Sequence, residues 1–206
     1  MNGADRARTP ADRLRLIRRR ELASHAGELL GSKEEALERE RARLEGHASR
    51  SGDEWSRRCE EAATELVRAR LLGASDELAR LVASGAASAT VEPDWQTSMG
   101  IAYAGSVACT SGESPQVTST AALRPAIEAF RRALESGAQH AAASLALRRL
   151  DRELADTRRR RRAIDDHLRP SLDRQLHDLD LRLDEIDRDE ALRVRLAVNR
   201  LEGERP

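Results

Sequence analysis

The stretch "LRRLDRELADTRRRRRAIDDHLRP", Leu147 to Pro170, decides the fold class of this chain. Its apolar and small side chains recur at alternating steps of three and four residues, which places them on one face of an α-helix. The same face resumes downstream at Leu172, Leu176, Leu179, Leu183 and Ile186. Such a stripe packs against a partner helix, so the sequence predicts one helix of a coiled coil here.

The partner stripe lies in the N-terminal part of the chain. Its helix has a clear start signal, because Thr9 can cap it, Pro10 needs no hydrogen-bond partner at the first helical position, and Asp12 lies in the first turn. We expect the two helices to pack along one apolar stripe, which we call the seam. The predicted seam contains Leu30, Leu37, Leu44, Leu66, Leu150, Leu154, Ile164, Leu168, Leu176, Leu179 and Leu183.

Composition divides the chain into two charged, Ala- and Leu-rich segments and a nearly uncharged segment between them. The predicted fold is mostly α, a long antiparallel two-helix intramolecular coiled coil with a small central β-hairpin or loop module. The predicted parts are an N-terminal tail (1–9), a first helix (10–83), the β/loop module (84–120), a second helix bent near Pro170 (121–202) and a C-terminal tail (203–206).

The central module contains "SATVEP" and "SMGIAYAGSVACT", in which Val, Ile, Tyr and Thr are punctuated by Gly and Pro. This composition is compatible with a short hairpin. Trp95 and Tyr103 are its expected anchors, and two roles stay open for them. They either pack the module onto the coiled coil or offer a contact surface.

The five consecutive arginines Arg158–Arg162, here called the arginine run, cover the whole circumference of a helix at about 100° per residue. Arg161 therefore falls on the seam. Either the seam opens locally toward Pro170, or Arg161 reaches an acidic partner on the first helix or a neighbouring protein of a complex. On this placement, Arg161→Val should stabilise the isolated helix pair. Pro170 should bend the helix without ending it, because the repeat continues on both sides.

Charge and motifs exclude several function classes. Lys and Arg together equal Asp and Glu at 36 each, so the zero net charge opposes nucleic-acid binding. "GELLGSK", which starts at Gly27, lacks the spacing and the preceding strand of a phosphate-binding loop, and we interpret Gly27 and Gly31 as small residues that allow close helix approach. Five scattered histidines predict no metal site. We expect no catalytic centre and no cofactor.

Two cysteines and the absence of an apolar N-terminal segment predict a cytoplasmic protein. No apolar run approaches the roughly 20 residues that cross a bilayer, so no direct membrane insertion is expected.

Several motifs together are similar to those of one protein family. "RLRLIRRRELASHAGELLGSK" is a Leu/Arg-rich run followed by L-A, a small-residue pair, L-L and a lysine, and "WQTSMGIAY" contains an M-G segment. The more specific match is a T-R-R-R motif with a following proline, which comprises Thr157, Arg158, Arg159, Arg160, Ala163 and Pro170. In these motifs the chain resembles the D subunit of the V-type (vacuolar and archaeal-type) rotary ATPases. Glu34 and Gly31 depart from commonly basic positions of the family, and Arg161 and Arg162 stand where Val and Asn are usual.

The resemblance implies a non-catalytic central rotor shaft that transmits torque between ATP hydrolysis or synthesis and proton or sodium transport. It implies as partners the ring of A and B subunits, the F subunit and the component that couples the stalk to the membrane ring. It also implies a location peripheral to the cell membrane. An autonomous coiled-coil scaffold or adaptor is the alternative, which explains the heptads but not the motif around Pro170.

Overall fold

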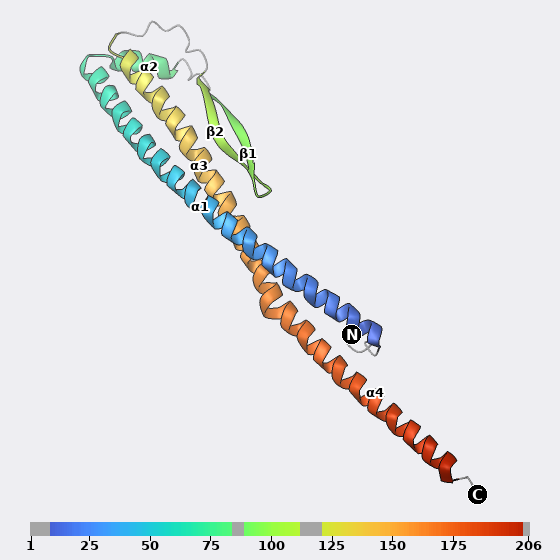
Figure 1. Ribbon diagram of the computed structural model, residues 1–206. Coiled ribbons are helices and arrows are strands. Elements are labelled where there is room, and N and C mark those ends of the chain that lie inside the picture. The colour runs from blue at the N-terminus through green and yellow to red at the C-terminus, as the bar shows by residue number, and fades with distance from the viewer. Residues whose placement is uncertain (1–8, 84–88, 112–120, 204–206) are drawn as a thin grey trace. The chain divides into compact units, whose positions relative to one another are not determined.

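The computed structural model describes residues 9–83, 89–111 and 121–203. Long helices pack together and a two-stranded antiparallel hairpin lies between them in sequence, which confirms the predicted fold class (Figure 1). The elements are α1 (Pro10–Leu71), α2 (Ser75–Ala83), β1 (Ala89–Ser98), β2 (Ile101–Ser111), α3 (Arg124–Arg162), the π-helical segment η2 (Ala163–Leu168) and α4 (Arg169–Gly203). Most of both predicted tails and the predicted module's ends, 84–88 and 112–120, lie outside the described residues.

The chain divides into two compact units, and each is described separately below. Unit 1 consists of residues 1–34 and 156–206, and unit 2 consists of residues 35–155. Unit 1 therefore contains the beginning of α1, the arginine run, η2 and α4. Unit 2 contains the rest of α1 and of α3, together with α2 and the hairpin.

The first helix begins where the sequence predicts. The Thr9 hydroxyl accepts a hydrogen bond from the Asp12 amide at 3.3 Å, and the Thr9 amide donates to the Asp12 carboxylate at 3.2 Å. This reciprocal pair satisfies two donors at the start of α1.

The helix does not continue to residue 83, because Gly73 adopts a φ of 85° just after α1 ends. The Ala74 amide then bonds the Ala69 carbonyl at 3.1 Å, closing the helix with a glycine C-terminal cap. The separate helix α2 follows.

The hairpin forms through a two-residue turn at Met99 and Gly100, which both have positive φ values of 52° and 80°. Positive φ at both positions matches the right-handed twist of the paired strands. The register shifts between Asp94 and Trp95, so that Gly105 has no partner on β1. The predicted hairpin is thus present, with a bulge in β2.

The second long helix passes Pro170 without ending. Pro170 is the second residue of α4, and η2 lies directly before it, with the Arg169 amide bonded to the Ile164 carbonyl five residues back. Leu168 departs from the predicted seam, since it lies in η2 and is 39% exposed. Its neighbours in the stripe, Ile164 and Leu172, are separated by eight residues instead of seven, so Leu168 falls out of the repeat.

Each unit has its own apolar core. In unit 1 the core contains Leu16, Ala23, Leu172 and Leu179, with Ile164, Leu176 and Leu183 partly buried against it. In unit 2 the main core contains Leu37, Leu44, Tyr103, Ala146, Leu150 and Leu154. Further cores of unit 2 are built largely from alanine, including Ala62, Ala69, Ala126, Ala129 and Ala133. Leu30 and Leu66 of the predicted seam are partly buried.

Candidate functional site

Charged side chains bridge the two long helices at regular intervals beside the seam. In unit 1, Arg13 Nε lies 2.7 Å from Asp180 Oδ1, and Arg20 Nε lies 2.6 Å from Asp173 Oδ1. Seven residues after Arg20, Gly27 faces Asp165, whose Oδ1 would lie 3.3 Å from a Cβ added to the glycine. We call this set of facing positions the ladder.

The next position of the ladder has the opposite polarity. Glu34, seven residues after Gly27, accepts hydrogen bonds from Arg158 Nε at 2.7 Å and from Arg161 Nη1 at 2.8 Å. Here the acid lies on α1 and the bases lie on α3, whereas arginine belongs to α1 in the pairs of Arg13 and Arg20. In unit 2, the Arg41–Asp151 pair at 2.7 Å returns to the usual polarity.

The pairing steps locate the extra residue of the second helix. The partner positions Asp180, Asp173, Asp165, Arg158 and Asp151 follow one another at intervals of seven, eight, seven and seven residues. The eight-residue interval spans part of η2. The π-helical turn therefore absorbs one residue and keeps the facing positions in step on both sides of it.

The Glu34 carboxylate is partly buried. Its side chain is 15% exposed, while those of Arg158 and Arg161 are 42% and 45% exposed. The charge-assisted hydrogen bond from Arg158 lowers the pKa of Glu34, and Arg161 acts in the same direction. Arg161 thus reaches an acidic partner on the first helix, which was one of the two outcomes expected for it.

The other residues of the T-R-R-R motif have different surroundings. Thr157 is 1% exposed, and in the described part of the chain its hydroxyl oxygen has no hydrogen-bond partner. Arg159 is exposed and pairs with Asp156 at 3.3 Å. Arg160, Ala163 and Pro170 are exposed. The motif therefore contributes the buried residue Thr157, the residue Arg158 that binds Glu34 on α1, and a group of exposed residues.

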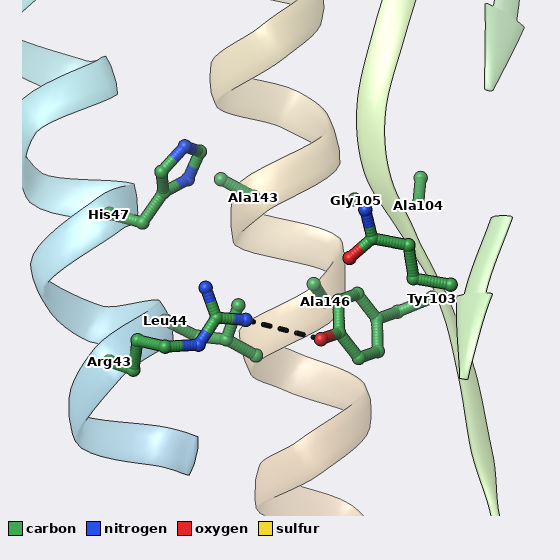
Figure 2. A pocket seen from close by; sticks show the side chains of 9 residues that line it. Arg43, Leu44, His47, Tyr103, Ala104, Gly105, Ala143 and Ala146 are labelled. Carbon is green, nitrogen blue, oxygen red and sulfur yellow. Dashed lines mark hydrogen bonds between the residues drawn. The ribbon is translucent and has the colours of Figure 1, made fainter. Parts of the chain in front are cut away.

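A second polar cluster holds the hairpin in unit 2. The Tyr103 hydroxyl donates to Glu40 Oε1 at 2.8 Å, and Arg43 bridges both groups, with its Nη2 at 2.7 Å from Glu40 Oε1 and 3.2 Å from the Tyr103 oxygen. Figure 2 shows Arg43 extending from α1 toward Tyr103 on β2, with Ala143 and Ala146 of α3 beside them. Tyr103 is 4% exposed and belongs to the main core.

The two predicted anchors of the hairpin differ in their burial. Tyr103 packs onto the helices, and burial raises its pKa while Arg43 lowers the pKa of Glu40. Trp95 is 57% exposed, with the Arg149 guanidinium 5.3 Å from its ring centroid. Arg149 also donates to the Ala102 carbonyl at 2.8 Å. No sequence motif indicated Glu40, Arg43 or Arg149 as partners of the hairpin.

Close helix approach is found at Gly27 but not at Gly31, where an added Cβ would meet no atom within 4 Å. The interpretation of Gly31 as an approach residue is therefore wrong. In unit 2, Gly137 allows the Trp55 indole to lie against α3, and the indole stacks on His140 at a centroid distance of 5.6 Å. His140 also lies 3.2 Å from the Ala48 carbonyl through its Nδ1.

Within residues 9–83, 89–111 and 121–203, no group of three or more His, Cys, Asp and Glu side chains could hold a metal ion. In the same residues, no helix is both long enough and apolar enough to cross a membrane.

A family model matches most of the chain. The model of a family described as the D subunit of ATP synthase matches residues 13–199, which include the ladder, the hairpin and the arginine run. Among curated proteins, nothing matches the chain.

Proposed function

Because the chain belongs to the family of ATP synthase D subunits, we propose that it is the central rotor shaft of a V-type rotary ATPase or ATP synthase. In this role it transmits torque between the subunits that hydrolyse or make ATP and the membrane ring that transports ions. It carries out no ATP chemistry itself. The observation that carries the proposal is the family match over residues 13–199.

The paired helices support a mechanical role. A single helix resists twisting poorly, whereas two helices joined along their length must twist together. In unit 1, ion pairs join α1 to the second long helix at Arg13, Arg20 and Glu34, and the apolar core joins them between these positions. Each exposed pair contributes only about 0.2–1 kcal/mol to stability, so the pairs orient the helices more than they hold them together.

The proposed partners are the ring of A and B subunits, the F subunit and the component that couples the stalk to the membrane ring. The chain would then be cytoplasmic and peripheral to the membrane as part of the complex. Exposed apolar residues on α4, including Leu192, Val194 and Leu196, are compatible with burial against a partner.

The test is co-expression of the full chain with the A, B and F subunits from the same source. We expect the chain to copurify with them and to sustain ATP-driven rotation of a bead fixed to it. Leu37 is fully buried, so Leu37→Asp should remove the chain from the complex, while the volume-conserving Leu37→Met should retain it.

A stable, folded chain that never joins the A, B and F subunits would overturn the proposal. That outcome would favour the autonomous scaffold instead.

A further inference from the structure

We propose that Glu34 fixes the register of the two long helices, because its ion pair is the one position of the ladder in unit 1 with inverted polarity. This assigns Glu34 a positioning role that does not depend on the rotor function. The proposal rests on the facing positions of the ladder and on the charges found there.

A heptad repeat does not by itself define the register of two antiparallel helices. Sliding one helix by seven residues returns seam positions to the seam, and displaces the helices along each other by about 10.5 Å. In unit 1 the core residues Leu172 and Leu179 of the second helix are identical and lie seven residues apart, so a slide exchanges leucine for leucine on that side of the seam. Charged residues beside the seam can favour one register where the apolar residues give two registers similar stability.

A uniform ladder would tolerate such a slide. If every pair placed arginine on α1 and aspartate on the second helix, each slide by one heptad would again bring arginine opposite aspartate. The pairs of Arg13 with Asp180 and Arg20 with Asp173 follow that uniform pattern. These two pairs alone therefore do not favour the observed register over a register slipped by one heptad.

Within unit 1, the inverted pair breaks the degeneracy in both directions. A slide by one heptad in one direction brings Glu34 opposite Asp165, which places like charges face to face and is destabilising. A slide in the other direction brings Arg158 opposite Gly27, so that both ion pairs of Glu34 are lost. The observed register instead pairs Glu34 with two arginines.

The decisive variant makes the ladder uniform. It carries Glu34→Arg and Arg158→Asp, with Arg161→Ala to remove the second arginine. Every pair of the ladder in unit 1 then has arginine on α1, so the slide that brought Glu34 opposite Asp165 now pairs arginine with aspartate. The matched control, Arg20→Asp with Asp173→Arg, also swaps a pair but leaves the Glu34 pair intact.

Register is read by the distance between two spin labels in the full chain, measured by double electron–electron resonance. The labels replace Leu22 and Leu192, which are 69% and 56% exposed and both belong to unit 1. Cys59 and Cys109 are replaced by serine in every sample, because they are free thiols that would also take the label. The two sites are far apart along the helices, so a one-heptad slide changes their distance by about 10 Å.

We expect one distance population in the parent chain and in the control. The uniform variant should show an additional population displaced by about 10 Å. A single, native distance in the folded uniform variant would overturn the proposal, because apolar packing and the connecting segments would then suffice to set the register.

A second variant keeps the test decisive if the uniform chain does not fold. Glu34→Gln, Arg158→Gln and Arg161→Gln make the position neutral without introducing a like-charge contact. This chain should also show the displaced population, to a smaller extent. A native distance alone in the neutral variant would refute the role of Glu34.

Discussion

Replacing Thr157 by valine should stabilise the chain. Thr157 is 1% exposed, and its hydroxyl oxygen has no hydrogen-bond partner among the described residues. A buried hydroxyl that has lost its water without gaining a partner costs about 1–3 kcal/mol. Valine keeps the shape and the β-branch of threonine, and the two residues have nearly equal helix propensities.

The size of the effect follows from these terms. Taking the lower part of the desolvation range, we expect Thr157→Val to raise the free energy of unfolding by about 1 kcal/mol. For a chain of about 200 residues this corresponds to an increase in Tm of about 2–4 °C. Thr157→Ser is the matched control, because it keeps the hydroxyl and removes a buried methyl group. It should lower the free energy of unfolding by about 1 kcal/mol.

The assay is urea unfolding of the full chain followed by circular dichroism at 222 nm, with thermal melts as a second measurement. The denaturant slope should be the same for all three proteins, so that midpoint shifts report stability. A Thr157→Val chain that is less stable than the parent would refute the reasoning. It would mean that the hydroxyl makes a bond whose loss outweighs its desolvation.

Four further substitutions test other contacts. Arg161→Val should lower the free energy of unfolding by about 0.5 kcal/mol, because a half-exposed ion pair is lost and little apolar area is buried. Urea unfolding measures this change. A more stable variant would instead support the placement of Arg161 on the seam. Tyr103→Phe should cost about 1 kcal/mol at pH 7 and speed amide exchange in β2. The pKa of Glu40 is lowered from 4.5, so the stability that its carboxylate contributes is present above pH 4.5 and is lost as pH falls through the lowered pKa. The destabilisation caused by Tyr103→Phe should therefore become smaller at that low pH. A destabilisation that does not change with pH would contradict the hydrogen bond between Tyr103 and Glu40. Gly31→Ala should gain up to about 1 kcal/mol in thermal melts, since the site is open. Gly137→Ala should lose about 1–3 kcal/mol, because its Cβ would lie 2.9 Å from an indole nitrogen; equal effects of the two alanines would contradict the packing described.

The long helices could be predicted because their signals are local and repeated. The cap at Thr9 and the leucine heptads act over a few residues, and tertiary packing does not oppose them. The end of α1 at Leu71 could not be predicted, since a lone glycine inside a helical pattern is compatible with both continuation and a cap. Only the left-handed conformation of Gly73 decides between them.

Side-chain partners across the two helices were harder to predict than the seam. Arg13, Arg20 and Arg41 are visibly spaced by sevens or multiples of seven, but the sequence does not state which residues face them until the register is known. The heptad pattern places Arg161 on the seam, where valine would stabilise. Its 45% exposure shows that it lies at the edge, where Glu34 is its partner.

The single extra residue in η2 also changes the angular position of everything that follows it. Since each α-helical residue turns the chain by about 100°, an uninterrupted helix would present the side chains of α4 more than a quarter of a turn away from their observed direction. A single helical wheel drawn from Arg124 to Gly203 therefore assigns the wrong faces to α4. For a homologous chain that lacks one residue between Ala163 and Leu168, a single helical wheel would assign the faces correctly. The two sequences must therefore be compared by the direction in which each side chain points from the helix axis, and not by residue number.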